Sequence, residues 1–233
     1  SAHKLQILAT LAFGAYVPFD RIHVEGIRQI DASDIEYARE LGYRIKLLAI
    51  AKQRNGELEA RVHPALIPED NMLAAVGGVH NAVYIVGDAV GSLMFYGRGA
   101  GQMPTASAVV SDIAEIARGL LHDPTARGIP PPPISDVEAK IKDMAAVRSC
   151  YYLRIMAIDK PGVLSRVTGI LGSNNISLVS VIQKGREEQS AVPIVMMTHE
   201  AVEGDMQRSL LAIDQLDVVD RPTVCFRVEG VTD

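Results

Sequence analysis

The sequence has no tryptophan, only two cysteines and no long apolar run. Cys150 and Cys225 make neither a disulfide framework nor a metal-ligand pair, so a reducing cytoplasm is the expected location. A helix that spans a bilayer needs about 18 or more consecutive apolar residues. No run reaches that length, and no signal peptide is visible, so we expect no membrane partner.

Positive charge is not in excess either. Lys and Arg number 23 against 28 Asp and Glu, for a formal net charge of −5. This balance argues against a nucleic-acid partner, whose surface would show clustered Lys and Arg. The six histidines show no metal-ligand spacing, so no metal site is predicted. With 233 residues, 48% of them hydrophobic, the chain is expected to form one large or two ordinary domains with a real core.

The usual glycine motifs of nucleotide-binding proteins are also missing. The stretch GRGAG at residues 97–101 is not followed by Gly-Lys-Ser/Thr, so it is not a P-loop. It does not complete G-x-G-x-x-G, because Gln102 or Pro104 stands where the third glycine belongs. What remains is a strand, a glycine turn and a helix. Two interpretations stay open: a loop whose backbone approaches a cofactor, or close packing of helix on strand.

Four consecutive prolines, Pro130 to Pro133, mark the clearest boundary in the chain. Such a run favours extended polyproline geometry and acts as a semi-rigid spacer. The sequence therefore predicts a first domain over residues 1–125, a Pro-rich linker over 126–147 and a second domain over 148–233.

The first domain shows mixed periodicity. Residues 2–13 have helical apolar spacing without a capping residue other than Ser1. A short helix is predicted to begin with a capping box of Ser33 and Glu36 and to end at Gly42, and Asn55-Gly56 predicts a tight hairpin. The helix after GRGAG has a wide apolar face and is expected to be packed in the core. Strands are expected at residues 21–27, 44–53, 58–64, 80–88 and 91–97, which together indicate a mixed sheet with helices on one face.

The second domain has the order βαββαβ. Strands are predicted at residues 151–158, 176–184, 191–200 and 221–230, and helices at 162–174 and 203–216. This order over about 80 residues predicts a four-stranded antiparallel sheet with both helices on one face, the ferredoxin-like arrangement. The fold class of the whole chain is therefore α+β.

The turn DKPGVLSRV, residues 159–167, is the candidate ligand site of the second domain. Pro161 suits a first helical turn, Gly162 lets backbone N–H groups face a ligand, and such groups attract a carboxylate. Asn175 is a candidate hydrogen-bonding partner for an amino-acid head group. The other interpretation is that Gly162 and Asn175 only make good turns.

This pattern, with NNISL at residues 174–178, resembles an ACT domain, the small regulatory module that binds amino acids. The resemblance covers Tyr151 to Val228. It implies an effector site at the first strand–helix turn and the partner's facing strand, with Pro161, Gly162, Val163, Asn175 and Ile176 as the effector-binding residues. ACT domains commonly pair sheet to sheet, and some have lost their ligand.

Three further stretches resemble homoserine dehydrogenase, in the bacterial form with a C-terminal ACT domain. They are AHKLQILATLAFG, GYRIKLLAIA and NAVYIVGDAVGSLMFYGRGAGQMPTASAVVSDI, and the resemblance covers essentially the entire chain. In that family the glycine loop lies beside the nicotinamide end of the cofactor. The resemblance therefore implies that Gly99, Ala100 and Gly101 contact NAD(P) through their backbone.

Lys4 is the implied catalytic residue. The family's signature ends in D-x-x-x-K, whose acid and ammonium share one helix face because they are four residues apart. The position four before Lys4 lies upstream of Ser1. Without the resemblance, Lys4 would be read as an ordinary solvated helix lysine.

The resemblance implies an enzyme of threonine, methionine and isoleucine biosynthesis that interconverts L-homoserine and L-aspartate 4-semialdehyde, with L-threonine as the feedback effector. A homodimer or homotetramer is expected. The family's N-terminal Rossmann domain, which binds most of the cofactor, is not found in the sequence, so we expect a C-terminal fragment that is inactive alone. The alternative is a non-catalytic ACT protein that senses amino acids.

Overall fold

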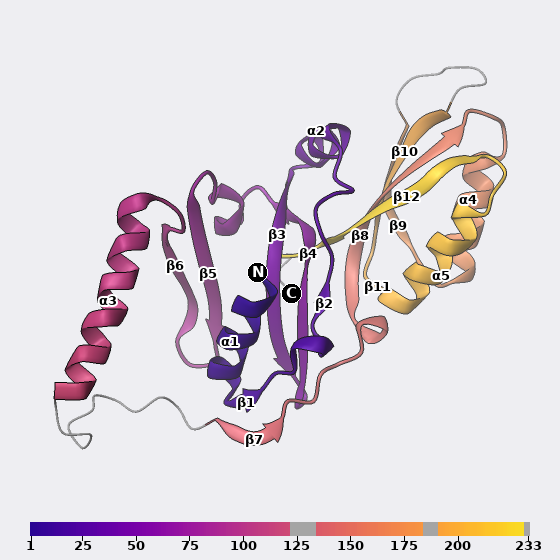
Figure 1. The fold of residues 1–233 in the computed structure, drawn as a ribbon. Coiled ribbons are helices and arrows are strands. Elements are labelled where there is room, and N and C mark those ends of the chain that lie inside the picture. Colours follow the sequence, from indigo (N-terminus) through magenta and orange to yellow (C-terminus); the bar gives the residue numbers. More distant parts are fainter. Residues whose placement is uncertain (122–133, 184–190, 231–233) are drawn as a thin grey trace. The chain divides into compact units, whose positions relative to one another are not determined.

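The computed structural model describes residues 1–121, 134–183 and 191–230 (Figure 1). The chain divides into two compact units. The first joins Ser1–Pro68 with Ile134–Asp233, and the second is Glu69–Pro133. The four-proline run lies outside the described residues.

A long β-hairpin is a main structural element of the first unit. Strands β3 (Tyr43–Arg54) and β4 (Glu57–Pro68) pair antiparallel without a register shift. Asn55 and Gly56 between them have φ values of 53° and 77°, the left-handed pair that a two-residue type I′ turn requires. The predicted hairpin is confirmed.

Helix α1 (Ala2–Phe13) rests on this hairpin. Its Leu5 and Ala9 are buried in a cluster with Val17, Ile22 and Leu58. The helix ends at Gly14, which has a φ of 64°. The short elements around it are β1 (Ala15–Tyr16), the 3-10 helix η1 (Phe19–Arg21) and β2 (His23–Val24).

Helix α2 (Ala32–Glu40) has a different cap from the one predicted. Asp31 is the N-cap, and it forms a capping box with Asp34, whose side chain accepts from the Asp31 N–H at 3.0 Å. The Ser33–Glu36 box is therefore wrong. An aspartate at each end of the box satisfies the same orphan N–H groups, and the helix consequently starts before Ser33. It ends at Leu41, before Gly42 with its φ of 81°.

The C-terminal part of the first unit has the predicted ferredoxin-like order. Its sheet runs β12-β8-β10-β9, all antiparallel. Helices α4 and α5 cover one face, where Leu153, Val167, Leu171, Met206 and Ile213 are buried together. The elements are β8 (Arg148–Ile158), α4 (Val163–Ser173), β9 (Leu178–Gln183), β10 (Ala191–Thr198), β11 (Ala201–Val202), α5 (Glu203–Asp214) and β12 (Val219–Val228).

This sheet continues into the N-terminal half of the chain. Strand β12 pairs parallel with β4, and the Glu229 N–H donates to the Leu66 carbonyl at 2.8 Å. The face opposite α4 and α5 is also covered, because Tyr152, Val195 and Phe226 pack with Ala38 of α2. The two halves of the first unit therefore share a core on that face.

The expected linker is partly built into the first unit. Strand β7 (Ser135–Glu138) pairs with β1, and the short 3-10 helix η4 (Met144–Ala146) follows. Leu58 exchanges backbone hydrogen bonds with Lys140 and Lys142, at 2.8 and 3.0 Å. The stretch from 134 onward is therefore tied to residues 1–68, whereas the boundaries of the two predicted domains stay a prediction.

The second unit is a hairpin followed by a helix. Strands β5 (His80–Gly87) and β6 (Gly91–Arg98) pair antiparallel, after the 3-10 helix η2 (Met72–Ala75), and α3 spans Gln102–Leu121. Among the described residues, α3 buries none of its side chains, and Val110, Ile113 and Leu120 are at least 60% exposed. The expectation that this helix is packed in the core is wrong for the described chain, because no second layer in its unit faces its apolar stripe. None of the described helices meets the length and hydropathy needed to cross a membrane.

Candidate functional site

Lys4 lies on the exposed side of α1. Leu5 and Ala9 hold the helix against the hairpin, and His3 stacks on Phe19 with ring centroids 4.4 Å apart. Within the part of the chain that the structure describes, Lys4 forms no hydrogen bond or ion pair, and its side chain is exposed. Its ammonium is therefore a free cation on an anchored helix, which fits a ligand-binding role.

Local packing and backbone conformation explain why glycines stand in this loop. A Cβ atom at Gly99 would lie 2.0 Å from the side-chain nitrogen of Asn81, so no other residue fits there unless Asn81 moves. The Gly99 N–H donates to the Val79 carbonyl at 2.8 Å. Gly101 has a φ of 132°, which disfavours a side chain, and its carbonyl accepts from the Thr105 N–H at 3.1 Å.

These hydrogen bonds reduce the number of backbone N–H groups in the loop that are available to a cofactor. The N–H of Gly99 is occupied, whereas those of Ala100 and Gly101 have no partner among the described residues. The exposed loop therefore has two backbone donors that fit a cofactor. Lys4 and this loop belong to different compact units.

The predicted effector turn is exposed on one side and buried on the other. Gly162, with a φ of 87°, is the N-cap of α4, and Asn175 has a φ of 58°. Pro161, Gly162 and Asn175 are exposed, whereas Val163 and Ile176 are buried in the core under α4.

The free donors at this turn are few. The N–H groups of Asn175 and Ile176 already donate to the Gly172 and Leu171 carbonyls, each at 3.0 Å. Within the described chain, the Gly162 N–H and the side-chain amide of Asn175 have no partner. Gly162 precedes α4 and Asn175 follows it, so the helix, 11 residues and about 16 Å long, separates these two groups, while Val163 and Ile176 contribute only through packing.

A buried ion pair that the sequence reasoning missed joins α2 to the C-terminal sheet. Arg154 of β8 binds Asp34 with two hydrogen bonds, Nε to Oδ1 at 2.6 Å and Nη2 to Oδ2 at 2.9 Å. Tyr152 donates its hydroxyl to the same Asp34 at 3.1 Å, and Arg154 also reaches Asp31 at 2.9 Å. Asp31 and Asp34 thus cap helix α2 and also bind Arg154 of the sheet.

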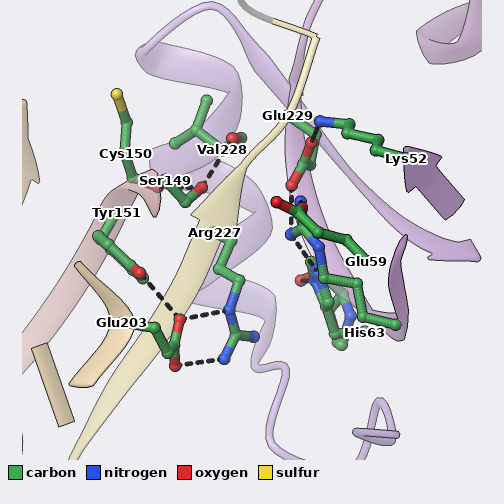
Figure 2. A network of polar contacts seen from close by, with 12 residues as sticks. Lys52, Glu59, His63, Ser149, Cys150, Tyr151, Glu203, Arg227, Val228 and Glu229 are labelled. Atoms are coloured by element: carbon green, nitrogen blue, oxygen red, sulfur yellow. Dashed lines mark hydrogen bonds and ion pairs between the residues drawn. The ribbon is translucent and has the colours of Figure 1, made fainter. Parts of the chain in front are cut away.

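A second buried group surrounds Arg227 on β12 (Figure 2). Its Nε and Nη2 donate to the two oxygens of Glu203 at 2.7 and 2.6 Å, and its Nη1 lies 2.9 Å from Glu25. Tyr151 donates its hydroxyl to Glu203 at 2.8 Å. Burial alone would raise the pKa of Glu25, but the hydrogen bond with His23 and the charge of Arg227 outweigh it and lower that pKa to about 2.

A third group lies where β4 meets the end of β12. Glu229 accepts from Arg61 at 2.6 Å and from Lys52 at 2.8 Å. Arg61 also approaches the Nε2 of His63 at 3.0 Å, and the Nδ1 of His63 lies 2.9 Å from the Pro64 carbonyl. Since a guanidinium only donates and a carbonyl only accepts, His63 is neutral with its proton on Nδ1. Burial, followed by the charge of Arg227, lowers the pKa of His63 to about 4.

These buried charges join the two halves of the first unit. The cations Arg61, Arg154 and Arg227 are all paired, so the groups fit a structural role better than catalysis. The sequence did contain a signal: Arg154 and Arg227 interrupt strands that are otherwise apolar, in YYLRIMAI and CFRV. A charge at such a position is rarely buried without a partner.

Comparison with known proteins identifies both halves. The family described as homoserine dehydrogenase matches residues 1–114. Residues 1–114 belong to the homoserine dehydrogenase family. The family described as ACT domain matches residues 151–218. Both predicted resemblances are confirmed.

Homoserine dehydrogenases from several bacteria match the whole chain. The Pseudomonas aeruginosa enzyme is 44% identical over 98% of this chain, and the Neisseria gonorrhoeae enzyme 43% identical over 100%. The chain covers 54% of each, so it spans about half the length of these curated relatives.

The solved structures agree with the fold. A homoserine dehydrogenase from Thiobacillus denitrificans superposes with a TM-score of 0.86 at 43% identity, covering 98% of this chain and 52% of that one. The Staphylococcus aureus homoserine dehydrogenase at pH 6.0 gives 0.64 at 28% identity, covering 99% and 53%. The α+β prediction, with a homoserine dehydrogenase sheet followed by an ACT domain, is thereby confirmed.

Proposed function

We propose that this chain forms the substrate-binding and regulatory part of an NAD(P)-dependent homoserine dehydrogenase. The observation that carries the proposal is the extent of the similarity: 43% identity runs through both the segment that holds Lys4 and the ACT domain. The reaction is the interconversion of L-homoserine and L-aspartate 4-semialdehyde in threonine, methionine and isoleucine biosynthesis. A reducing cytoplasm as its location is consistent with the two free thiols.

The residues have distinct roles in this proposal. The bound nicotinamide supplies the hydride chemistry, and the protein positions and polarises the substrate. The free ammonium of Lys4 holds the substrate hydroxyl or assists its proton transfer. The N–H groups of Ala100 and Gly101 contact the cofactor. Residues 1–125 supply the floor of the substrate site and the sheet through which a homodimer or homotetramer forms.

Lys4→Ala in the full-length protein tests the catalytic role. We expect turnover of L-homoserine, followed by nicotinamide absorbance, to be abolished, while circular dichroism stays unchanged because Lys4 is exposed. Lys140→Ala, at a lysine that pairs with Glu57 on the surface, is the matched control and should keep normal turnover. Normal turnover in Lys4→Ala would contradict the catalytic role of Lys4, whereas no turnover by the unsubstituted full-length protein would favour the rival function, an amino-acid sensor without catalysis.

We further propose that this chain alone transfers no hydride. Its sequence has no G-x-G-x-x-G fingerprint after a strand, the motif that places a dinucleotide pyrophosphate on a helix N-terminus. Measurable oxidation of L-homoserine by the isolated chain would overturn this statement.

The ACT domain is proposed to bind L-threonine at the exposed β8–α4 turn. The Gly162 N–H would receive the carboxylate, and Asn175, at the other end of α4, would reach the head group of an effector held by a second copy of the chain. Feedback control requires that threonine binds two states of the enzyme differently. Calorimetry on the chain should show heat with threonine and a loss of about tenfold or more in affinity for Asn175→Ala. Heat with another amino acid and none with threonine would change the effector.

A further inference from the structure

One cavity of the first compact unit is lined by none of the predicted site residues. It has a volume of about 730 Å³ and is bounded by the segment between β2 and α2, by α5 and by β12. The whole cavity belongs to the first compact unit, so its walls are placed relative to one another. Its lining residues are Glu25, Gly26, Ile27, Arg28, Gln29, Gln207, Leu210, Thr223, Cys225 and Arg227. None of them belongs to the glycine loop or to the β8–α4 turn.

One wall offers negative charge. Both His23 and Arg227 bind the Oε1 atom of Glu25, at 2.6 and 2.9 Å. Its Oε2 atom has no partner within the described residues, although Glu25 is ionised because its pKa is lowered to about 2. Gln207 donates its Nε2 to Glu203 at 2.7 Å, which leaves its amide oxygen as a second acceptor. An ammonium group fits two such acceptors.

The segment that carries Glu25 also offers positive charge. Arg28 is exposed and, among the residues described, has neither a hydrogen bond nor an ion pair. Arg227 does not compete for an anion, because Nε, Nη1 and Nη2 are engaged by Glu203 and Glu25. A guanidinium without a partner matches the fork of a carboxylate.

Apolar and weakly polar groups complete the lining. Ile27 and Leu210 contribute aliphatic surface. Burial raises the pKa of the Cys225 thiol, which is therefore neutral, and the Thr223 hydroxyl is already bonded to Asp214 at 2.6 Å. The cavity thus combines two hydrogen-bond acceptors, Glu25 and Gln207, with the cation Arg28 and an uncharged remaining lining.

We propose that this cavity binds a small zwitterionic amino acid. Its ammonium lies against Glu25 and Gln207, its carboxylate meets Arg28, and its side chain packs on Ile27 and Leu210. The ligand bridges the homoserine dehydrogenase segment and helix α5 of the ACT domain, so its binding changes the free energy of holding these two parts together. The proposal does not depend on the catalytic role of Lys4 or on the β8–α4 turn.

Two substitutions in the full chain separate this site from the turn. Arg28→Gln removes an exposed cation, and Gly26→Trp fills the cavity, since a Cβ at Gly26 meets nothing within 4 Å and the φ is ordinary. Matched controls are Arg221→Gln, which is exposed on β12 but outside the cavity lining, and Gly77→Trp, which has the same free space in the other unit. Asn175→Ala reports on the turn.

Isothermal titration with each common L-amino acid is the measurement. We expect one small amino acid whose affinity falls by about tenfold or more in Arg28→Gln and Gly26→Trp and is unchanged in both controls and in Asn175→Ala. Its decarboxylated amine and its N-acetyl form should not bind, because each lacks one of the two charges. Circular dichroism checks that the variants fold.

Three results would overturn the proposal. They are no binding by any amino acid, unchanged affinity in Arg28→Gln, and equal binding of the decarboxylated or N-acetylated form. Loss of binding only in Asn175→Ala would place the ligand at the turn instead. Turnover of L-homoserine is measured separately, so failure here leaves the catalytic proposal standing.

Discussion

Arg227 is one of three buried arginines in the described chain that each pair with two carboxylates. It is 4% exposed and faces the carboxylates of Glu203 and Glu25. Arg227→Met should lower the free energy of unfolding by about 3–5 kcal/mol, because two carboxylates lose their common partner. Denaturant titration of the chain measures this. Arg148→Met, which breaks an exposed pair with Glu200, should lose at most about 1 kcal/mol; equal losses would contradict the argument.

His63 predicts how stability depends on pH. Its pKa is about 4 in the folded chain, against an ordinary value of 6.5, because burial and the charges of Arg227 and Arg61 outweigh the opposite effect of Glu229. Between these two pH values the unfolded chain binds a proton that the folded chain does not, so stability falls as the pH falls from 6.5 to 4.

A titration of the unfolding free energy across that range tests the prediction. His63→Gln should flatten the slope between pH 6.5 and 4, because the group that takes up the proton is gone. The decrease below about pH 4.5, to which Glu25 contributes as its carboxylate is protonated, should remain. An unchanged slope in His63→Gln would contradict the role of His63.

Helix α4 offers a matched pair of glycines at the level of one element. Gly162 has a φ of 87° at the N-cap, whereas Gly169 lies inside the helix, with an ordinary φ and open space around it. Gly162→Ala should destabilise the chain by about 1–2 kcal/mol through the left-handed backbone. Gly169→Ala should stabilise it by about 0.5–1 kcal/mol through helix propensity. Thermal denaturation compares the two, and a shift of the same sign in both would contradict this reading of the turn.

Helix α3 shows that an apolar periodicity does not indicate which part of a protein covers the apolar face. Its apolar residues recur with helical spacing, and the helix forms as predicted. The pattern says that a face is apolar, but burial depends on a second layer that no described residue of its unit provides. The expectation of a packed core failed for this reason.

The whole molecule divides into two compact units, and the larger one contains residues matched by both families. Because β4 and β12 are hydrogen-bonded neighbours, we expect residues 1–68 and 134–230 to unfold together. Leu171→Ala, in the core under α4, should cost about 2–5 kcal/mol and speed hydrogen exchange in β4 as well as in β8.

Val83→Ala supplies the control for that experiment. Val83 lies on the β5–β6 hairpin of the second unit and is 39% exposed. The substitution should leave exchange in β4 and β8 unchanged. If Leu171→Ala accelerated exchange in β8 but not in β4, the two halves of the first unit would be independent folding units, and the continuous sheet would not couple them.

Much of this protein follows from its sequence. Apolar spacing located α1, α4 and α5, Asn55-Gly56 marked the β3–β4 hairpin, and the βαββαβ order predicted the ACT sheet, because all of these depend on residues close together in the chain. Lys4 came from family resemblance, the effector turn came from its Pro-Gly pattern together with that resemblance, and their roles stay predictions.

Only the tertiary structure decided which distant residues meet. The pairing of Arg154 with Asp34, and of Arg227 with Glu203 and Glu25, joins residues more than 20 positions apart, and no local pattern encodes it. The same holds for the parallel pairing of β12 with β4. The sequence shows that a charged residue within an apolar strand needs a partner, but the tertiary structure decides which residue that partner is.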